Sequence, residues 1–335
     1  MRAPALLEAR SGAGGGALFA ALDLGTNNCR LLVGAPARGG FRVVDSFSRI
    51  VRLGEGLART GALSDAAMAR TLDAMAACAE RLTRRRVRHF AAVATEACRR
   101  ATNGAPFLAR VAAETGLRPR IITPREEAEL AMESCAPLLA PGDRRAILFD
   151  IGGGSTEIAW IRAVRPPELI GYASIPYGVV TLAERAGANC YSTQGFLEVA
   201  DEVTERLAAF DRLHCIRQEV ARGGVRLIGT SGTVTTLAGV VLDLPRYRRQ
   251  FVDGIELPGH AADTALARLF EMGRNGLSLH PCVGPERADF VLPGCAVYAA
   301  IRRLWPVESL TVADRGLREG MLMRLMRGDV RRPRH

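Results

Sequence analysis

The sequence predicts an α/β fold built from two related halves. Apolar stretches of strand length alternate with longer stretches of helical periodicity, which is the pattern of α/β architectures. An apolar strand that begins at Ala17 ends in DLGTNN at 23–28, and a later apolar strand ends in DIGGGS at 150–155. Each is followed at once by another strand, so both segments predict β-hairpins. The repeated hairpin indicates a duplication, and 335 residues permit one large or two medium-sized domains.

The other elements follow from apolar periodicity and from the residues at their ends. Ser64 precedes the first helical stretch and is a residue type that caps helix N-termini. Between the hairpins we expect helices over 64–84 and 106–115, a strand over 89–94, and a helix that starts near 123 and ends at 139. Beyond them we expect strands over 170–175 and 309–313, a strand from 225 that enters a Gly/Thr/Ser turn, and helices over 193–213, 235–241, 285–304 and 316–327.

The charged residues favour a polyanionic ligand. All 45 basic residues are arginine, against 35 acidic residues, and the formal net charge is +10. The lack of lysine excludes a Walker-type phosphate loop and Schiff-base chemistry, because both need a primary amine. Arginine forks bind phosphate oxygens two at a time, so the surface suits polyanions.

Cysteine spacing and hydropathy exclude several other classes of protein. The eight cysteines contain no C-x-x-C pair, so the sequence does not support a zinc site, and we expect reduced core thiols. No run of about 18 apolar residues occurs, and residues 1–16 lack an apolar stretch long enough for a signal peptide. We therefore expect no membrane span and a cytoplasmic protein.

Residues 150–157 give the strongest chemical signal. Gly152, Gly153 and Gly154 let the backbone approach a ligand closely and point several N–H groups at one position, as a phosphate requires. Asp150 and Glu157 flank them, and a hairpin brings both toward its mouth. Two carboxylates beside a phosphate site are typical of magnesium binding. The alternative is an ordinary glycine-rich turn, which has no use for flanking acids.

Two further segments are candidate phosphate sites. GTSGT at 229–233 lies between a strand and a helix, so the helix N-terminus would point its partial positive charge at a phosphate. A capped strand-to-helix turn is the alternative. Arg99 follows the strand over 89–94 and is a candidate phosphate ligand, although a lone arginine in this chain is more often a solvated charge.

Glu126 and Glu127 open the helix that begins near 123, and two interpretations of them remain. Acids in a first helical turn complement the helix dipole. A carboxylate on a segment that joins two halves could instead act as general base toward water. The sequence pattern by itself leaves both open.

Seven motifs occur in order from about Leu18 to Met326. They are DLGTN at 23–27, RLGEGL at 52–57, ATEACR at 94–99, EEA at 126–128, DIGGGSTE at 150–157, GTSGT at 229–233 and DRGLREG at 314–320. Together they resemble the exopolyphosphatase/guanosine pentaphosphate phosphatase (Ppx/GppA) family, in its short two-domain form. The resemblance implies an actin-like, sugar-kinase-like fold of two lobes around a cleft. It divides the chain into a disordered tail at 1–16, a first domain at 17–130 completed by the helix at 316–328, a second domain at 131–315, and a basic tail at 329–335.

The resemblance also assigns roles by position. Glu127 matches the glutamate that activates the attacking water, and Arg99 matches a phosphate-holding arginine. Asp150 and Glu157 match the metal-side acids, and Asp23 stands at the equivalent place in the first hairpin. The expected phosphate-binding residues are Asn27, Arg99, Gly152, Gly153, Gly154, Ser155, Thr156, Gly229, Thr230, Ser231, Gly232 and Thr233.

Three residues depart from the family pattern. Glu96, Thr26 and Asn28 stand where serines are common. Glu96 brings a negative charge near the expected phosphate path, so these departures bear on the choice of substrate.

The implied activity is Mg²⁺-dependent (or Mn²⁺-dependent) release of terminal orthophosphate from inorganic polyphosphate. The runner-up substrate is guanosine pentaphosphate (pppGpp), against which an aromatic content of only 5% argues weakly, because a base needs a stacking partner. An actin-like ATPase or sugar kinase and a non-catalytic protein that binds polyanions or nucleotides are further alternatives. We expect no specific nucleic acid and no membrane as partners, and the sequence allows a homodimer.

Overall fold

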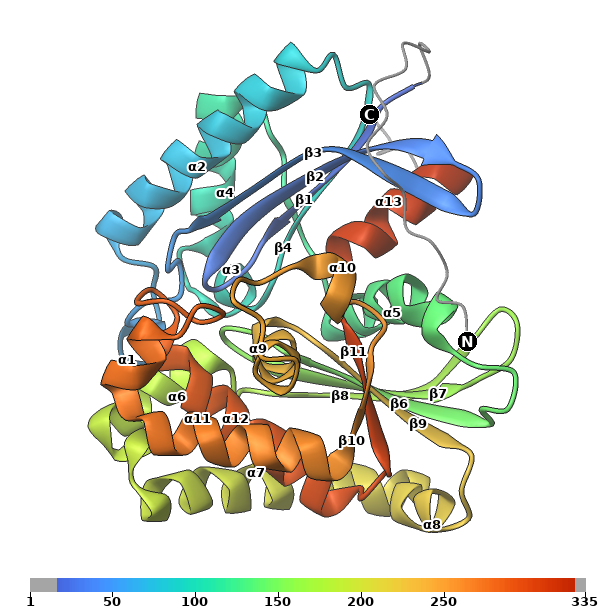
Figure 1. The fold of residues 1–335 in the computed structure, drawn as a ribbon. Helices are drawn as coiled ribbons and strands as arrows, with labels where there is room; N and C mark the ends of the chain where they lie inside the picture. Colours follow the sequence, from blue (N-terminus) through green and yellow to red (C-terminus); the bar gives the residue numbers. More distant parts are fainter. Residues whose placement is uncertain (1–16, 329–335) are drawn as a thin grey trace.

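Two β-sheets, one above the other in Figure 1, form the cores of two lobes in this computed structural model. The structure describes residues 17–328. In this range the first sheet has five strands and the second has six. The tails expected at 1–16 and 329–335 lie outside the described residues.

The first sheet has the strand order β3-β2-β1-β4-β5. Its strands are β1 (Phe19–Leu24), β2 (Asn28–Ala37), β3 (Gly40–Ile50), β4 (His89–Ala94) and β5 (Arg120–Ile121). β1 pairs antiparallel with β2 and parallel with β4. Helices α2 (Asp65–Arg84) and α4 (Gly104–Thr115) cover one face, and α13 (Leu317–Arg327) covers the other (Figure 1). The short helices α1 (Leu57–Thr60) and α3 (Glu96–Arg100) follow β3 and β4.

The second sheet repeats this topology, because its order is β10-β11-β9-β6-β7-β8 and β6 pairs antiparallel with β7 and parallel with β9. Its strands are β6 (Arg145–Ile151), β7 (Thr156–Arg162), β8 (Glu168–Ile175), β9 (Val225–Thr230), β10 (Glu256–Pro258) and β11 (Ser309–Ala313). The helices of this half are α6 (Val179–Ala186), α7 (Thr193–His214), α8 (Ile216–Ala221), α9 (Gly232–Val241), α10 (Arg249–Val252), α11 (Gly259–Leu279) and α12 (Ala288–Leu304). None of the helices between residues 17 and 328 is both long and apolar enough to cross a membrane.

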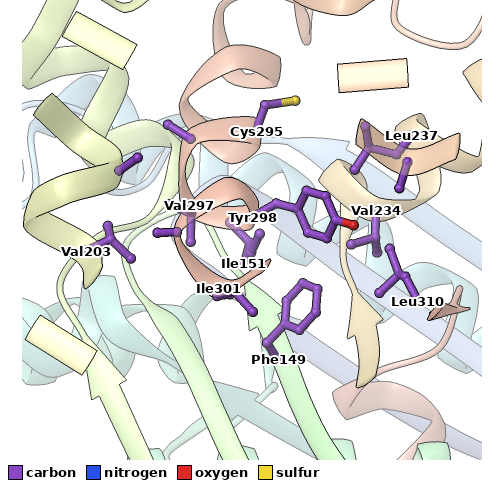
Figure 2. Close-up of a cluster of buried hydrophobic side chains, with 14 of the residues drawn as sticks. Phe149, Ile151, Val203, Val234, Leu237, Cys295, Val297, Tyr298, Ile301 and Leu310 are labelled. Carbon is purple, nitrogen blue, oxygen red and sulfur yellow. The ribbon is translucent and has the colours of Figure 1, made fainter. Parts of the chain in front are cut away.

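A large apolar cluster joins α12 to the underside of the second sheet. Val297, Tyr298 and Ile301 of α12 face Phe149 and its neighbours on the sheet (Figure 2). The rings of Phe149 and Tyr298 lie 6.2 Å apart between centroids. Close packing of this kind leaves the strand little freedom to move. It therefore holds β6, whose last residues carry Asp150 toward the other lobe.

Helix α5 (Pro124–Cys135) lies between the two sheets and contacts both. Thr123 caps it, accepting a hydrogen bond from the Glu126 amide at 3.2 Å, and Pro124 occupies the first turn. Leu130 packs in one cluster with residues of β1 and β2, while Ala131 packs in another with residues of β6 and β7. This helix therefore fixes Glu127 between the lobes.

Most of the expected elements are confirmed, and the differences have local causes. The strands over 89–94 and 309–313 and the helix over 64–84 match β4, β11 and α2. The helix expected to end at 139 is α5 followed by a 3₁₀ turn over Ala136–Leu138, and α9 begins at Gly232 rather than at 235. The sequence analysis missed β3, because its side chains are mostly exposed and give little apolar alternation.

Gly320 provides a test of how α13 is seated. A Cβ at this position would lie 2.2 Å from the carbonyl oxygen of Leu130 in α5, so the two helices would have to separate. We expect Gly320→Ala to lower the free energy of unfolding by about 1–3 kcal/mol. Gly142→Ala is the matched control, since nothing lies within 4 Å of its Cβ position. Equal stability of the two variants in urea denaturation would contradict this packing.

Candidate active site

A cavity of about 490 Å³ lies between the lobes, where the turns of the two hairpins meet. Its walls are formed by residues 25–28 of the first hairpin, residues 152–155 of the second, the turn after β9 and the start of α13. β6 and β9 are parallel neighbours, so their carboxyl ends reach the cavity together. The fold thus brings widely separated motifs to one place.

The cavity wall contains most of the predicted site residues. These are Asp23, Asn27, Glu127, Asp150, Gly152, Gly153, Gly154, Ser155, Glu157, Thr230, Ser231, Gly232 and Thr233. Arg99, Thr156 and Gly229 are not part of the wall. The Thr156 hydroxyl donates to the Tyr177 carbonyl at 2.6 Å, and a Cβ on Gly229 would lie 2.4 Å from Phe149. Thr156 and Gly229 therefore have packing roles beneath the site.

Acidic side chains stand at equivalent places on the two hairpins. Asp150 and Glu157 are directly opposite each other in the β6–β7 ladder. In the first hairpin Asp23 is opposite Arg30, so the position of Glu157 is taken there by an arginine. Ser155 and Ser174 donate to Glu157 Oε1 at 2.5 and 3.1 Å, which fixes that carboxylate. The second hairpin therefore contributes two acidic residues, and the first contributes one acidic residue and one arginine.

Burial raises the pKa values of these acids. It raises the pKa of Asp150 to about 6, with the nearby Asp23 adding to the shift and Arg30 opposing it. Burial likewise raises the pKa of Glu157, and the charge of Asp150 adds to that effect. Burial also raises the pKa of Glu127. The charge of Glu157 adds to this rise, and Arg99 opposes it. The acids thus form one interacting group in a poorly solvated cleft.

The acids fit a hard divalent cation that shares its coordination with a ligand. Mg²⁺ is usually bound through one or two carboxylates, with water and phosphate oxygens as its other ligands. Asp150 and Glu157 offer carboxylate oxygens from neighbouring strands. In the part of the chain that the structure describes, no three His, Cys, Asp or Glu side chains are placed to hold a metal ion together. The donor set is therefore of the open kind and not a closed protein cage.

The glycine-rich turn is pressed against the first hairpin. A Cβ on Gly154 would lie 2.6 Å from Thr26 Oγ1, and a Cβ on Gly153 would lie 3.2 Å from the Asn27 amide nitrogen. The Gly153 carbonyl accepts a hydrogen bond from the Val180 amide at 2.8 Å, which ties the turn to α6. Glycine is thus required here by the close approach of the two hairpin turns.

The turn before α9 has the features of an anion site. Ser231 has a φ of 100°, an unfavourable value for a residue with a side chain. Its buried hydroxyl oxygen has no hydrogen-bond partner within residues 17–328, and neither does the Asn27 side-chain oxygen. Both residues line the cavity, and Ser231 stands at the N-terminal end of α9, whose free amides favour negative charge.

Arg99 lies behind Glu127 and does not face the cavity. One guanidinium nitrogen, Nη2, donates to Glu96 at 2.6 Å and to Glu127 at 3.1 Å, and Nη1 donates to the Ile122 carbonyl at 2.7 Å. Glu127 is buried, with 5% of its surface exposed. The structure therefore places Arg99 where it orients Glu127, with Glu96 on its other side.

The sequence analysis missed three arginines in the cavity wall. Arg30, Arg287 and Arg318 all line the cavity. Within the described residues, Arg30 and Arg287 form no ion pair, and Arg318 lies 3.9 Å from Glu319. Two of the three could have been found, because Arg30 aligns with Glu157 in the repeat and Arg318 is part of the motif at 314–320. Arg287 lies in none of the motifs.

Known proteins resemble this chain in sequence and in fold. Residues 32–328 match the Ppx/GppA phosphatase family. Exopolyphosphatase 2 of two Mycobacterium tuberculosis strains is 32% identical over 320 residues, covering 91% of this chain and 98% of that protein. The chain in the type II variant crystal structure of the Aquifex aeolicus Ppx/GppA phosphatase is 27% identical in sequence to this chain. The two structures align with a TM-score of 0.72, covering 92% of this chain and 99% of that one. A Cytophaga hutchinsonii exopolyphosphatase has the same fold, with a TM-score of 0.83 at 22% identity, covering 93% of this chain and 98% of that one.

The fold and the cleft define a two-lobed, actin-like phosphatase, which confirms the predicted fold class. The chain belongs to the Ppx/GppA phosphatase family. It is therefore a hydrolase, as the sequence motifs predict.

The buried acids predict a pH-dependent stability. The folded-state pKa of Asp150, about 6, lies above its ordinary value of 3.8. At pH 8 Asp150 is ionised and its charge destabilises the folded state, whereas at pH 3 it is protonated and this penalty is absent. We expect Asp150→Asn to raise the free energy of unfolding at pH 8 by about 1–3 kcal/mol. The gain should shrink as the pH falls through about 6.

Asp289→Asn is the control for this prediction. Arg274 lowers the pKa of Asp289, so this substitution should reduce stability at pH 8. Urea denaturation at several pH values measures both effects. A loss of stability at pH 8 in Asp150→Asn would show that the fold stabilises the ionised carboxylate.

Proposed function

We propose that this phosphatase is an exopolyphosphatase that releases terminal orthophosphate from inorganic polyphosphate. The observation that carries the proposal is one cavity lined by three acids, Glu127, Asp150 and Glu157, and by three arginines, Arg30, Arg287 and Arg318. The acids suit a reacting terminal phosphate with its water and cation, while the arginines suit the rest of an anionic chain. The name of the Mycobacterium tuberculosis relative supports this substrate.

Glu127 is the proposed general base. It accepts a proton from a water molecule as the water oxygen forms a bond to the terminal phosphorus. The P–O bond to the next phosphate breaks in line with the attack, and the chain, shortened by one unit, leaves with the bridging oxygen. Arg99 bonds to Glu127 Oε2, so it favours the carboxylate form and holds it in position. No covalent intermediate is needed.

Asp150 and Glu157 are the proposed ligands of Mg²⁺; Asp23, the third acid predicted from the sequence, lies on the facing hairpin and is not placed to share the ion with both of them. When bound, the cation supplies charge neutralisation at the phosphate oxygens. The amides of Gly153 and Gly154 and of the turn before α9 bind the same oxygens from the protein side. The Ser231 hydroxyl, which has no hydrogen-bond partner within residues 17–328, can donate to these oxygens as well.

Hydrolysis of the 5′-terminal phosphate of guanosine pentaphosphate is the second candidate function. Tyr247 and Phe290 also line the cavity, and their rings offer a surface on which a base can stack. Purified protein with Mg²⁺, supplied with long polyphosphate, guanosine pentaphosphate or ATP, distinguishes the candidates by phosphate release. Release from guanosine pentaphosphate alone would reject the first proposal.

Removal of the base is a direct test of the mechanism. We expect Glu127→Gln to lower kcat by about 10²–10⁴-fold while polyphosphate still binds, because the amide keeps the shape but cannot accept the proton. Glu126→Gln is the control, since Glu126 pairs with Arg120 on the surface. Phosphate release and equilibrium binding measure the two effects. Near-normal turnover in Glu127→Gln would assign the base elsewhere.

Loss of a proposed metal ligand should change the cation requirement. We expect Glu157→Gln to raise the Mg²⁺ concentration needed for half-maximal activity, with partial recovery at high Mg²⁺, because an anionic oxygen is lost. Glu168→Gln, an exposed change on the adjacent strand β8, should leave the requirement unchanged. A Mg²⁺ titration of both variants provides the measurement. The same titration curve for both would show that Glu157 is not a ligand.

A further inference from the structure

The loop between α9 and α10 brings arginines to the edge of the active-site cavity. Residues 245–249 read PRYRR, and Tyr247 lines the cavity. The Tyr247 hydroxyl donates to Asp314, and Arg249 donates to Glu319 at 3.3 Å; both acids also line the cavity. These contacts hold the loop beside the start of α13, between the two lobes (Figure 1).

Arg246 and Arg248 flank Tyr247 and are exposed. Within residues 17–328, Arg246 forms no ion pair, and Arg248 lies over the ring of Phe251 at 6.0 Å without an acidic partner. The acids on either side of the loop are already engaged: Asp243 lies 4.0 Å from Arg268, and Asp253 binds Arg315 at 2.6 Å. The loop therefore presents two uncompensated positive charges to the solvent at the cavity edge.

The other arginine clusters do not have this combination of position and free charge. Arg144, Arg302 and Arg303 are held by carbonyl or carboxylate oxygens of their own lobe. Arg84 and Arg88 are exposed, but Arg84 ends α2 and Arg88 lies just beyond it, and this end of α2 lies at the far side of the first lobe from the second (Figure 1). Among these clusters, the pair at 246 and 248 is the one joined to the cavity.

We infer that Arg246 and Arg248 form an exit rim. When the end of a long chain lies in the cavity, this rim binds the phosphates that extend outside it, and it so sets a preference for chain length. The inference rests on the proposed exopolyphosphatase function. Arg30, Arg287 and Arg318 inside the cavity serve short and long chains alike, whereas the rim is reached only by a chain that extends past Tyr247. A flexible polyanion gains affinity from each additional neutralised phosphate.

The experiment compares tripolyphosphate with long-chain polyphosphate. We expect the double variant Arg246→Ala/Arg248→Ala to raise KM for the long chain roughly 2- to 30-fold, with kcat unchanged, because two exposed charge contacts are lost. KM for tripolyphosphate should not change. The salt dependence of KM for the long chain should become shallower, since fewer counterions are released on binding.

Two further variants separate charge from general effects. Arg246→Lys/Arg248→Lys keeps both charges and should retain most of the long-chain affinity. Arg84→Ala/Arg88→Ala removes the same charge far from the cavity and should leave both KM values unchanged.

The two possible failures are distinguishable. If the unmodified protein releases no phosphate from either polyphosphate, the proposed function is rejected. If it does so and the rim variant keeps the original KM for the long chain, the exit rim is rejected. An equal rise in KM for tripolyphosphate and for the long chain would also reject the rim, because it would place these arginines within the cavity's own binding site.

Discussion

The contact between the two hairpin turns determines the geometry of the active site. Residues 26 and 27 of the first turn lie so close to Gly153 and Gly154 of the second that a methyl group on either glycine would meet them. The second turn thus has no side chains at these two positions, and the first turn packs directly against its backbone. Because the turns end equivalent strands of a duplicated topology, the close contact also brings Asp23 and Asp150 into one poorly solvated space.

This geometry has an electrostatic cost, which arginines near the acids partly offset. Carboxylates gathered away from water repel each other and lose hydration. Arg99 offsets part of this cost behind Glu127, where it is shared by Glu96 and Glu127. Arg30 opposes the rise in the pKa of Asp23 and of Asp150, and within residues 17–328 neither Arg30 nor Arg287 forms an ion pair. The cavity thus combines acids with arginine charges that remain available to a ligand.

Local chemistry could be predicted from the sequence, and contacts across the fold could not. The hairpins, the glycine turns and the cap at Ser64 depend on neighbouring residues, and they appear where the pattern places them. The role of Glu127 as general base was predicted only through the resemblance, since its position in a first helical turn also fits a purely structural role. Arg287 carries no local signal, because it reaches the cavity only through the packing of α12 against the second sheet. Gly229 appeared to belong to a phosphate loop, but its lack of a side chain accommodates Phe149.

The position of α13 has a consequence for how the chain is made. Met321 and Leu322 cover Ala21, Leu32 and Val93 on the first sheet, although more than 220 residues separate each of them from these partners. During synthesis from the N-terminus, the strands of the first lobe emerge early, and Leu130 of α5 covers only part of their apolar face; the rest stays uncovered until α13 has left the ribosome. The second lobe receives all its strands and its covering helix α12 before that moment. The half of the protein that is translated first is therefore the last to be completed, and throughout elongation it presents an apolar sheet face on which chaperones can act.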